Sequence, residues 1–120
     1  MPTIYIVDDD ESVRDSARAL LESYDLTVED YGSARDFLAA YEAEEEGACL
    51  LLDLNMPEMS GLELLALLRE RGIDIPVIIV SAQDDAAVKE RARIAGAFAF
   101  FDKPVDDTLM KAIDRALERS

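Results

Sequence analysis

The stretch Ala48-Cys49-Leu50-Leu51-Leu52-Asp53 decides the fold, because five apolar residues run directly into a carboxylate. An apolar run without polar alternation is typical of a strand that is covered on both faces in a parallel sheet. Three more runs of this kind are residues 4–7, 77–80 and 97–101. We therefore expect four interior strands. Residues 27–31 alternate apolar and polar side chains and are predicted to form a fifth strand at the edge of the sheet.

Apolar residues with helical spacing fill the segments between these strands. The predicted helices include residues 13–24, 37–41, 62–68, 84–95 and 109–117. Regular alternation of strands and helices predicts right-handed crossovers and an α/β fold, a doubly wound parallel sheet with helices on both faces. Functional sites in such sheets form beyond the carboxyl ends of the strands.

Length and charge limit the classes of function. A chain of 120 residues, 50% of them hydrophobic, predicts a single domain over residues 1–120. The formal net charge of −15 argues against direct nucleic-acid binding by this segment and against contact with anionic lipid. No stretch approaches the roughly 20 apolar residues that span a bilayer, and the N-terminus lacks the pattern of a signal peptide. We expect a cytoplasmic protein without membrane contact.

The chain contains no histidine. This absence removes Ser-His and Cys-His nucleophile pairs, imidazole metal ligands and any phosphohistidine carried on this chain. Cys49 lies in an apolar run and is expected to be a small buried hydrophobe rather than a reactive thiol. The chemistry must therefore use carboxylates, hydroxyls or lysine.

Polar residues follow each of the four apolar runs. They are Asp8 and Asp9, then Asp53, then Ser81, and finally Lys103. Because the carboxyl ends of parallel strands meet at one edge, these side chains are expected to converge. Clustered carboxylates raise one another's pKa unless a cation is present, and Mg²⁺ prefers such oxygen ligands. The ammonium of Lys103 and the hydroxyl of Ser81 suit a bound phosphoryl group. The other interpretation of an Asp triplet is an acidic cap of the following helix.

Four segments match a known family. They are Ile6-Val7-Asp8-Asp9-Asp10, the loop 53–61, Val80-Ser81-Ala82 and Phe101-Asp102-Lys103-Pro104. With these motifs the sequence resembles the receiver domain of bacterial two-component response regulators over essentially its full length. Residues 33–38 and the loop after Asp53 are most similar to the FixJ-like group, whose members often carry a DNA-binding domain behind the receiver. The resemblance implies a flavodoxin-like fold with five parallel strands in the order 2-1-3-4-5, flanked by five helices.

The resemblance assigns the role of phosphoacceptor to Asp53. It implies a Mg²⁺ site made by Asp9, by Asp8 through water, by Asp53 and by the backbone carbonyl of Asn55. A partner histidine kinase or histidine phosphotransfer protein would present phosphohistidine, and Mg²⁺ with Lys103 would stabilise the transferring charge. The chain would then be no enzyme but a phosphoacceptor that assists its own phosphorylation and dephosphorylation.

The resemblance also implies a switch. Ser81 would move to the phosphoryl oxygen and Phe100 would turn toward the vacated space, which remodels the face of the fourth helix, fifth strand and fifth helix. This face would control an output partner or a C-terminal effector domain. Phe100 in place of tyrosine excludes a switch through a phenolic hydrogen bond. Ala99 stands where many members carry an acid, which argues against a charge-paired, phosphorylation-dependent homodimer and leaves an apolar one open.

Two rival functions are weighed against this interpretation. A magnesium phosphohydrolase of the haloacid dehalogenase type needs a second acid two residues after its nucleophile, where this chain has Asn55. A non-phosphorylated pseudo-receiver, which works only by binding, usually lacks one of the site residues that are all present here. The output stays open between a stand-alone receiver and the receiver of a longer transcription regulator.

Overall fold

The computed structural model describes residues 2–42, 47–82, 85–103 and 106–119. These residues form strands and helices that alternate along the chain, as predicted. The strands are β1 (Thr3–Val7), β2 (Thr27–Tyr31), β3 (Ala48–Leu52), β4 (Val77–Ser81) and β5 (Ala99–Asp102). The helices are α1 (Glu11–Glu22), α2 (Ala34–Ala40), α3 (Gly61–Glu70), α4 (Ala86–Ile94) and α5 (Thr108–Arg119).

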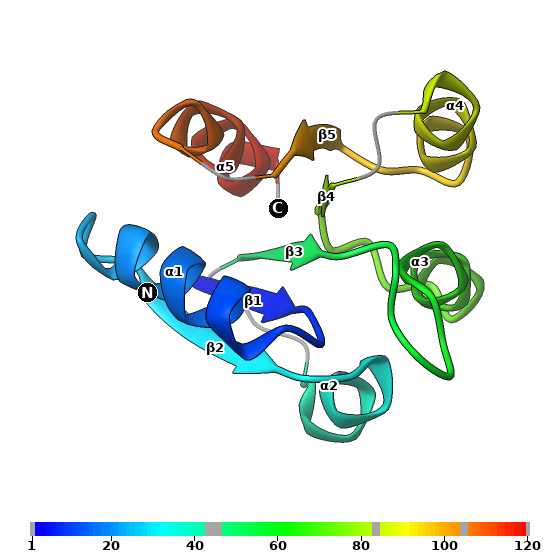
Figure 1. Ribbon diagram of the computed structural model, residues 1–120, viewed down its shortest axis with the longest axis horizontal. Helices are drawn as coiled ribbons and strands as arrows, with labels where there is room; N and C mark the ends of the chain where they lie inside the picture. Colours follow the sequence, from blue (N-terminus) through cyan, green and yellow to red (C-terminus); the bar gives the residue numbers. More distant parts are fainter. Residues whose placement is uncertain (1, 43–46, 83–84, 104–105, 120) are drawn as a thin grey trace.

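The strands form one parallel sheet in the order β2-β1-β3-β4-β5. Helices α1 and α5 cover one face of the sheet, and α2, α3 and α4 cover the other (Figure 1). This arrangement is the doubly wound, flavodoxin-like fold expected from the sequence. The direction of winding changes between β1 and β3, so the switch point lies beyond the carboxyl ends of these two strands.

Each strand contributes to two hydrophobic cores, because successive side chains point to opposite faces of the sheet. Val7, Leu50 and Ile79 belong to the core under α2, α3 and α4. Ile6 and Leu51 belong to the core under α1 and α5. Every residue of β1, β3 and β4 is buried, which explains why these strands are apolar almost without interruption.

Strand β5 lies at the edge of the sheet, as the strand order implied by the resemblance requires, so the prediction of an interior strand from the apolar run 97–101 was wrong. Among the described strands it pairs with β4 only, and its first three residues are half-buried. Its run is apolar because both faces of the strand still lie against helices. The prediction of an edge strand at β2 is confirmed, since Val28 is buried between the exposed Thr27 and Glu29.

Helix ends near the predicted site are fixed by side-chain caps. Asp10 caps α1. The alternative interpretation of the aspartate triplet, a cap of the following helix, thus applies to its third member. Ser60 begins α3 with a reciprocal capping box, and Ser33 caps α2. Gly72 and Gly96 follow α3 and α4 with positive φ angles of 75° and 102°, which glycine adopts readily at the end of a helix.

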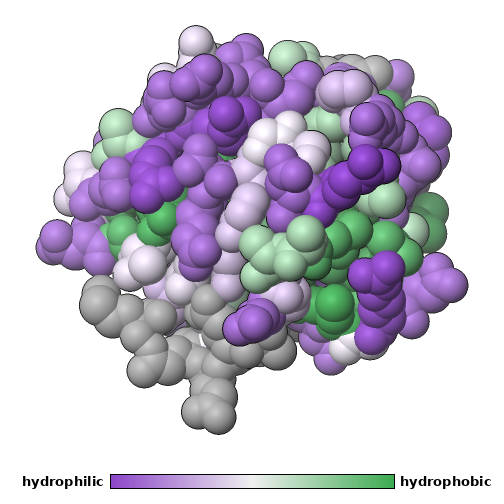
Figure 2. Space-filling view, turned by 90° about the horizontal axis from the view of Figure 1, so that it is seen from below, coloured by the Kyte–Doolittle hydropathy of each residue, from purple (hydrophilic) through white to green (hydrophobic). Residues whose placement is uncertain are grey.

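The surface is largely polar. Figure 2 shows one face that is mostly hydrophilic, with one larger hydrophobic patch and smaller hydrophobic areas apart from it. Among the described residues, Tyr24 and Ile94 are the large apolar side chains with high exposure. Phe98 is half-buried, and an apolar homodimer stays a prediction. The described helices include none that is long and apolar enough to cross a membrane.

Candidate functional site

The predicted site residues lie at or just past the carboxyl ends of the strands. Asp8 follows β1, Asp53 follows β3 and Lys103 follows β5, while Ser81 is the last residue of β4. Backbone hydrogen bonds continue the sheet through these positions: Asp8 N–H donates to Tyr31 O at 3.2 Å, Asp53 N–H to Val7 O at 3.0 Å and Lys103 N–H to Ser81 O at 2.9 Å. The ladder therefore fixes the backbone beneath each functional side chain.

Three carboxylates and one ammonium converge at this edge. Asp8, Asp9 and Asp53 each offer a carboxylate oxygen, and these oxygens lie within 4.8 Å of one another. Asp8 and Asp53 are buried, with 4% and 6% of their surface exposed, and Asp9 is exposed. The Lys103 Nζ lies 2.8 Å from Asp8 Oδ2 and 3.2 Å from Asp53 Oδ1. One ammonium is thus shared by two buried carboxylates.

The electrostatics of the cluster are unbalanced. Burial raises the pKa of Asp53, the charge of Asp8 raises it further, and Lys103 offsets these effects only in part. Burial lowers the pKa of Lys103, but the carboxylates of Asp8 and Asp53 more than offset this and leave that pKa raised. A hard divalent cation fits the cluster, because all the donors are oxygens and the buried pair holds more negative charge than Lys103 neutralises.

Gly61, the first residue of α3, packs against the backbone of Asp53. Its N–H donates to Leu54 O at 2.9 Å, and a Cβ at this position would lie 2.2 Å from Asp53 O. The requirement for glycine at Gly61 therefore comes from close approach to the backbone rather than from a left-handed φ angle. Asn55 is exposed in the same loop. Pro104, the other part of the lysine motif, lies outside the described residues.

Ser81 and Phe100 lie on the same face of the sheet. Phe100 pairs with Ile79 in the β4–β5 register, and Ser81 follows Ile79 by two residues, so their side chains point toward the α4 side. Ser81 is fully buried. Phe100 is half-buried against the core under α2, α3 and α4, and Lys89 Nζ of α4 lies 5.5 Å from the centre of its ring. The two residues predicted as a switch are therefore neighbours beneath α4.

Arg14 was not predicted as a site residue. Its Nη1 donates to the backbone carbonyl of Asp8 at 2.7 Å, and its Nε donates to Asp30 Oδ2 at 3.1 Å. The only signal in the sequence is a basic residue one turn after an aspartate triplet, in a chain with few basic residues. Such a signal does not identify a backbone carbonyl as the acceptor.

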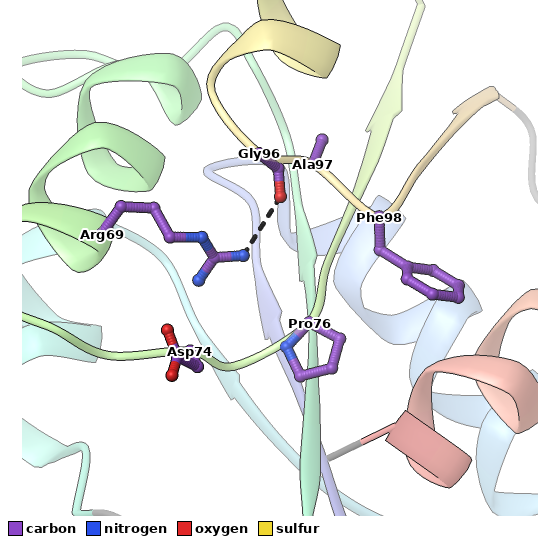
Figure 3. Close-up of a pocket in the computed structure, with 6 residues that line it drawn as sticks. All are labelled: Arg69, Asp74, Pro76, Gly96, Ala97 and Phe98. Atoms are coloured by element: carbon purple, nitrogen blue, oxygen red, sulfur yellow. Dashed lines mark hydrogen bonds between the residues drawn. The ribbon is translucent and has the colours of Figure 1, made fainter.

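A cavity of about 400 Å³ lies at the opposite ends of the strands, next to the residues that precede β4 and β5. Figure 3 shows its lining residues, Arg69, Asp74, Pro76, Gly96, Ala97 and Phe98. The guanidinium of Arg69 donates to Ile73 O at 2.8 Å and to Gly96 O at 3.2 Å. None of the predicted site residues lines this cavity.

Cys49 is part of neither the carboxylate cluster nor the lining of the cavity. It is fully buried in β3, and burial raises the pKa of its thiol to about 12. The expectation of a small buried hydrophobe is confirmed, since a thiol with this pKa stays protonated near neutral pH.

Comparison with known proteins gives a family match and curated relatives. A family model for the response regulator receiver domain matches residues 4–114. Transcriptional regulatory protein TdiR of Thauera aromatica is 43% identical over 116 residues, which are 96% of this chain and 51% of TdiR. Transcriptional regulatory protein FixJ of Rhizobium meliloti (strain 1021) is 40% identical over 117 residues, which are 97% of this chain and 57% of FixJ. The chain spans about half the length of these relatives.

Solved structures of response regulators are also similar to this chain. The crystal structure of FixJ-N matches with a TM-score of 0.90 at 39% identity, over 100% of this chain and 96% of that one. The structure of the response regulator StyR matches with a TM-score of 0.88 at 39% identity, over 98% of this chain and 60% of that one. The similarity to FixJ that the motifs predicted is thus confirmed in sequence and in fold.

Proposed function

The chain belongs to the response regulator receiver domain family, and from this premise we propose that it is the phosphoacceptor switch of a two-component system. Residues 1–120 would act as one domain, with Asp53 as the phosphoacceptor. One observation carries the proposal: the buried carboxylate of Asp53 has carboxylates of Asp8 and Asp9 within 4.8 Å and the ammonium of Lys103 at 3.2 Å. A buried nucleophile beside a cation and two further acids suits phosphoryl transfer.

Mg²⁺ is the proposed cofactor, as receiver domains generally bind it at an acidic pocket. Asp8, Asp9, Asp53 and the backbone carbonyl of Asn55 would hold it. When bound, Mg²⁺ supplies positive charge that offsets the repulsion among the carboxylates and the charge of the incoming phosphoryl group.

The chain's own residues perform the transfer. A carboxylate oxygen of Asp53 attacks the phosphorus of a phosphohistidine on the partner protein, so that a P–O bond forms and the P–N bond breaks. The electron pair of that bond leaves with the imidazole of the partner, which takes a proton from its surroundings. Lys103, already paired with Asp53, keeps its ammonium next to the transferring charge. The product is an aspartyl phosphate, and its hydrolysis returns the domain to the starting state.

The proposed switch runs through Ser81 and Phe100. Ser81 would donate its hydroxyl to a phosphoryl oxygen on Asp53, and Phe100 would turn toward the space that Ser81 leaves. The two side chains lie on the same face of β4 and β5 under α4, which supports a direct coupling between them. The α4–β5–α5 face would then change its shape for an output partner.

The proposed partners follow from the relatives. A histidine kinase or a histidine phosphotransfer protein would supply the phosphoryl group. TdiR and FixJ are named transcriptional regulatory proteins, and this chain covers 51% and 57% of their lengths. We therefore propose that the switch controls an output protein or an effector domain, and that this domain does not itself bind nucleic acid.

Intact mass after incubation with acetyl phosphate and Mg²⁺ tests the proposal. The wild type should gain one phosphoryl group, and the Asp53→Asn variant should gain none. Removal of Mg²⁺ with a chelator should prevent the gain. Equal labelling of Asp53→Asn would contradict the assignment of Asp53, and repeated turnover of a phosphate ester by unmodified protein would favour the phosphohydrolase instead.

A further inference from the structure

Arg14 links the acidic loop to the neighbouring strand. It lies in α1 one turn after the cap Asp10, and its side chain points back toward the start of the helix, over the loop after β1. Nη1 donates to Asp8 O at 2.7 Å and Nε donates to Asp30 Oδ2 at 3.1 Å, with 18% of the side chain exposed. One guanidinium therefore joins α1, the β1–α1 loop and β2.

These contacts fix the peptide that joins Asp8 to Asp9. The N–H of Asp8 is held by Tyr31 O of β2 at 3.2 Å, and its carbonyl is held by Arg14. Because a peptide unit is planar, an anchored Asp8 carbonyl also fixes the direction of the Asp9 nitrogen. Asp9 is exposed, whereas Asp8 is buried against Lys103. The position of Asp9 thus depends on the peptide that Arg14 holds.

The role of Arg14 is orientation more than charge. Its positive charge is already paired with Asp30, so it adds little net charge to the carboxylate cluster. Its planar guanidinium, by contrast, donates hydrogen bonds to two acceptors in different directions, which a single ammonium does less well. Second-layer contacts of this kind commonly set the affinity of a metal site.

Gly32 gives independent support. Its φ angle is not among the positive ones, so no backbone strain demands a glycine there. A Cβ at Gly32 would lie 3.3 Å from Arg14 Nη1, closer than an ordinary contact. The absence of a side chain at Gly32 leaves room for the guanidinium in the place where it reaches Asp8.

From these contacts we propose that Arg14 is a positioning residue for the Mg²⁺ site, which holds the Asp8–Asp9 peptide so that Asp9 faces Asp53. The inference rests on the proposed function and adds a residue to it. Arg14 itself touches neither the metal nor the phosphoryl group.

Arg18 offers a matched control on the same helix. Its Nη1 donates to the other oxygen of Asp30 at 2.6 Å, and its Nε lies 3.4 Å from Glu22. Arg14→Met and Arg18→Met therefore remove the same charge and each remove one contact with Asp30, and only Arg14→Met removes the bond to the Asp8 carbonyl. Arg14→Met should lower the free energy of unfolding more, because it leaves that carbonyl without its charged donor.

Isothermal titration of MgCl₂ into each variant tests the proposal. Arg14→Met should raise the Kd for Mg²⁺ about tenfold, the lower end of what second-layer changes cause, and Arg18→Met should leave it within about twofold. Arg14→Lys should restore the Kd only in part. Gly32→Ala should raise the Kd by a smaller factor and should have no further effect when Arg14 is already methionine.

Three outcomes are decisive. A wild type that binds Mg²⁺ while Arg14→Met binds it equally well would overturn the role of Arg14 and leave the proposed function intact. Equal losses in Arg14→Met and Arg18→Met would assign the effect to Asp30 or to charge and would also overturn it. A wild type that does not bind Mg²⁺ would overturn the metal site and this role together. Should Arg14→Met fail to fold by circular dichroism, Gly32→Ala carries the same test.

Discussion

Buried charges are compensated in different ways at the two ends of the strands, called here the carboxyl edge and the amino edge of the sheet. At the carboxyl edge, beyond β1 and β3, Asp8 and Asp53 share one ammonium, that of Lys103. At the amino edge, before β4 and β5, the guanidinium of Arg69 bonds to two backbone carbonyls. At the carboxyl edge, Lys103 offsets the repulsion between the two buried carboxylates only in part, so a bound cation can relieve it. At the amino edge, the charge of Arg69 is already hydrogen-bonded within the protein. This difference supports the proposed placement of the site at the first edge, with structural support at the second.

The pKa shifts follow the same contrast. Burial raises the pKa of Asp53 and lowers the pKa of Arg69, so both charged forms are disfavoured by their surroundings. Because its pKa is raised, Asp53 binds a proton more readily than an ordinary aspartate. A bound cation or phosphoryl group would change the ionisation of this carboxyl. Arg69 stays charged at any ordinary pH, and its burial is compensated by its hydrogen bonds and by the negative charge of Asp74.

The largest expected effect is that of Gly61→Ala at the carboxyl edge. The new Cβ would lie 2.2 Å from Asp53 O, so the backbone of Asp53 or of α3 must shift. We expect a loss of about 3 kcal/mol in the free energy of unfolding, measured by urea denaturation, together with slower phosphoryl labelling of Asp53.

Gly72→Ala provides the control for Gly61 from the other edge. It has open space around its Cα but a φ angle of 75°, so alanine there should cost about 1 kcal/mol through backbone strain alone. Labelling of Asp53 should not change. Equal costs at the two glycines, or slower labelling from Gly72→Ala, would contradict the contrast between the edges.

The next effect is that of Arg69→Met at the amino edge. The carbonyls of Ile73 and Gly96 would lose a charged donor, and α4 would lose its link to the end of α3 (Figure 3). We expect a loss of about 2 kcal/mol in urea denaturation, because hydrogen bonds to charged groups contribute more than neutral ones. The exposed Arg71→Met should change stability by less than about 0.5 kcal/mol. A strong loss of phosphoryl labelling in Arg69→Met would show that the two edges are not independent.

The sequence predicted the carboxyl edge better than the amino edge for a physical reason. Asp8 and Asp53 follow an apolar run by one residue and Lys103 follows one by two, so local pattern and parallel topology together bring them to one place. Arg14 and Arg69 bond to the backbone carbonyls of Asp8, Ile73 and Gly96, and a backbone carbonyl has no signature in the sequence. Their contacts could be found only in the folded chain.

Two other expectations show the same limit. Gly61 belongs to a loop that matches the family motif, but its close approach to Asp53 O depends on how α3 packs against the end of β3. The run that contains β5 was expected inside the sheet, because burial by helices on both faces gives an edge strand the composition of an interior one. Periodicity records which faces of a strand are buried, so it identifies an edge strand with one exposed face, as in β2, and misses one that is covered on both faces, as in β5.

The smallest expected effect is that of Asp53→Asn on stability without Mg²⁺. Because the pKa of Asp53 is raised in the folded state, ionisation of this carboxyl opposes folding. The wild type should therefore lose stability as pH rises from below the ordinary aspartate pKa through the raised one, and asparagine should not. The variant should be more stable than the wild type by about 1 kcal/mol at neutral pH, with the difference vanishing in acid.

Urea denaturation in chelator across this pH range measures the difference, and Asp9→Asn serves as its control. Asp9 carries the same charge in the same cluster but is exposed, so water already screens it and its replacement should stabilise the fold less. Addition of Mg²⁺ should stabilise the wild type more than Asp53→Asn, because the cation relieves the repulsion that the variant lacks. A wild type that is the more stable protein at every pH would mean that Lys103 fully neutralises the buried pair, and the contrast between the two edges would then be wrong at its centre.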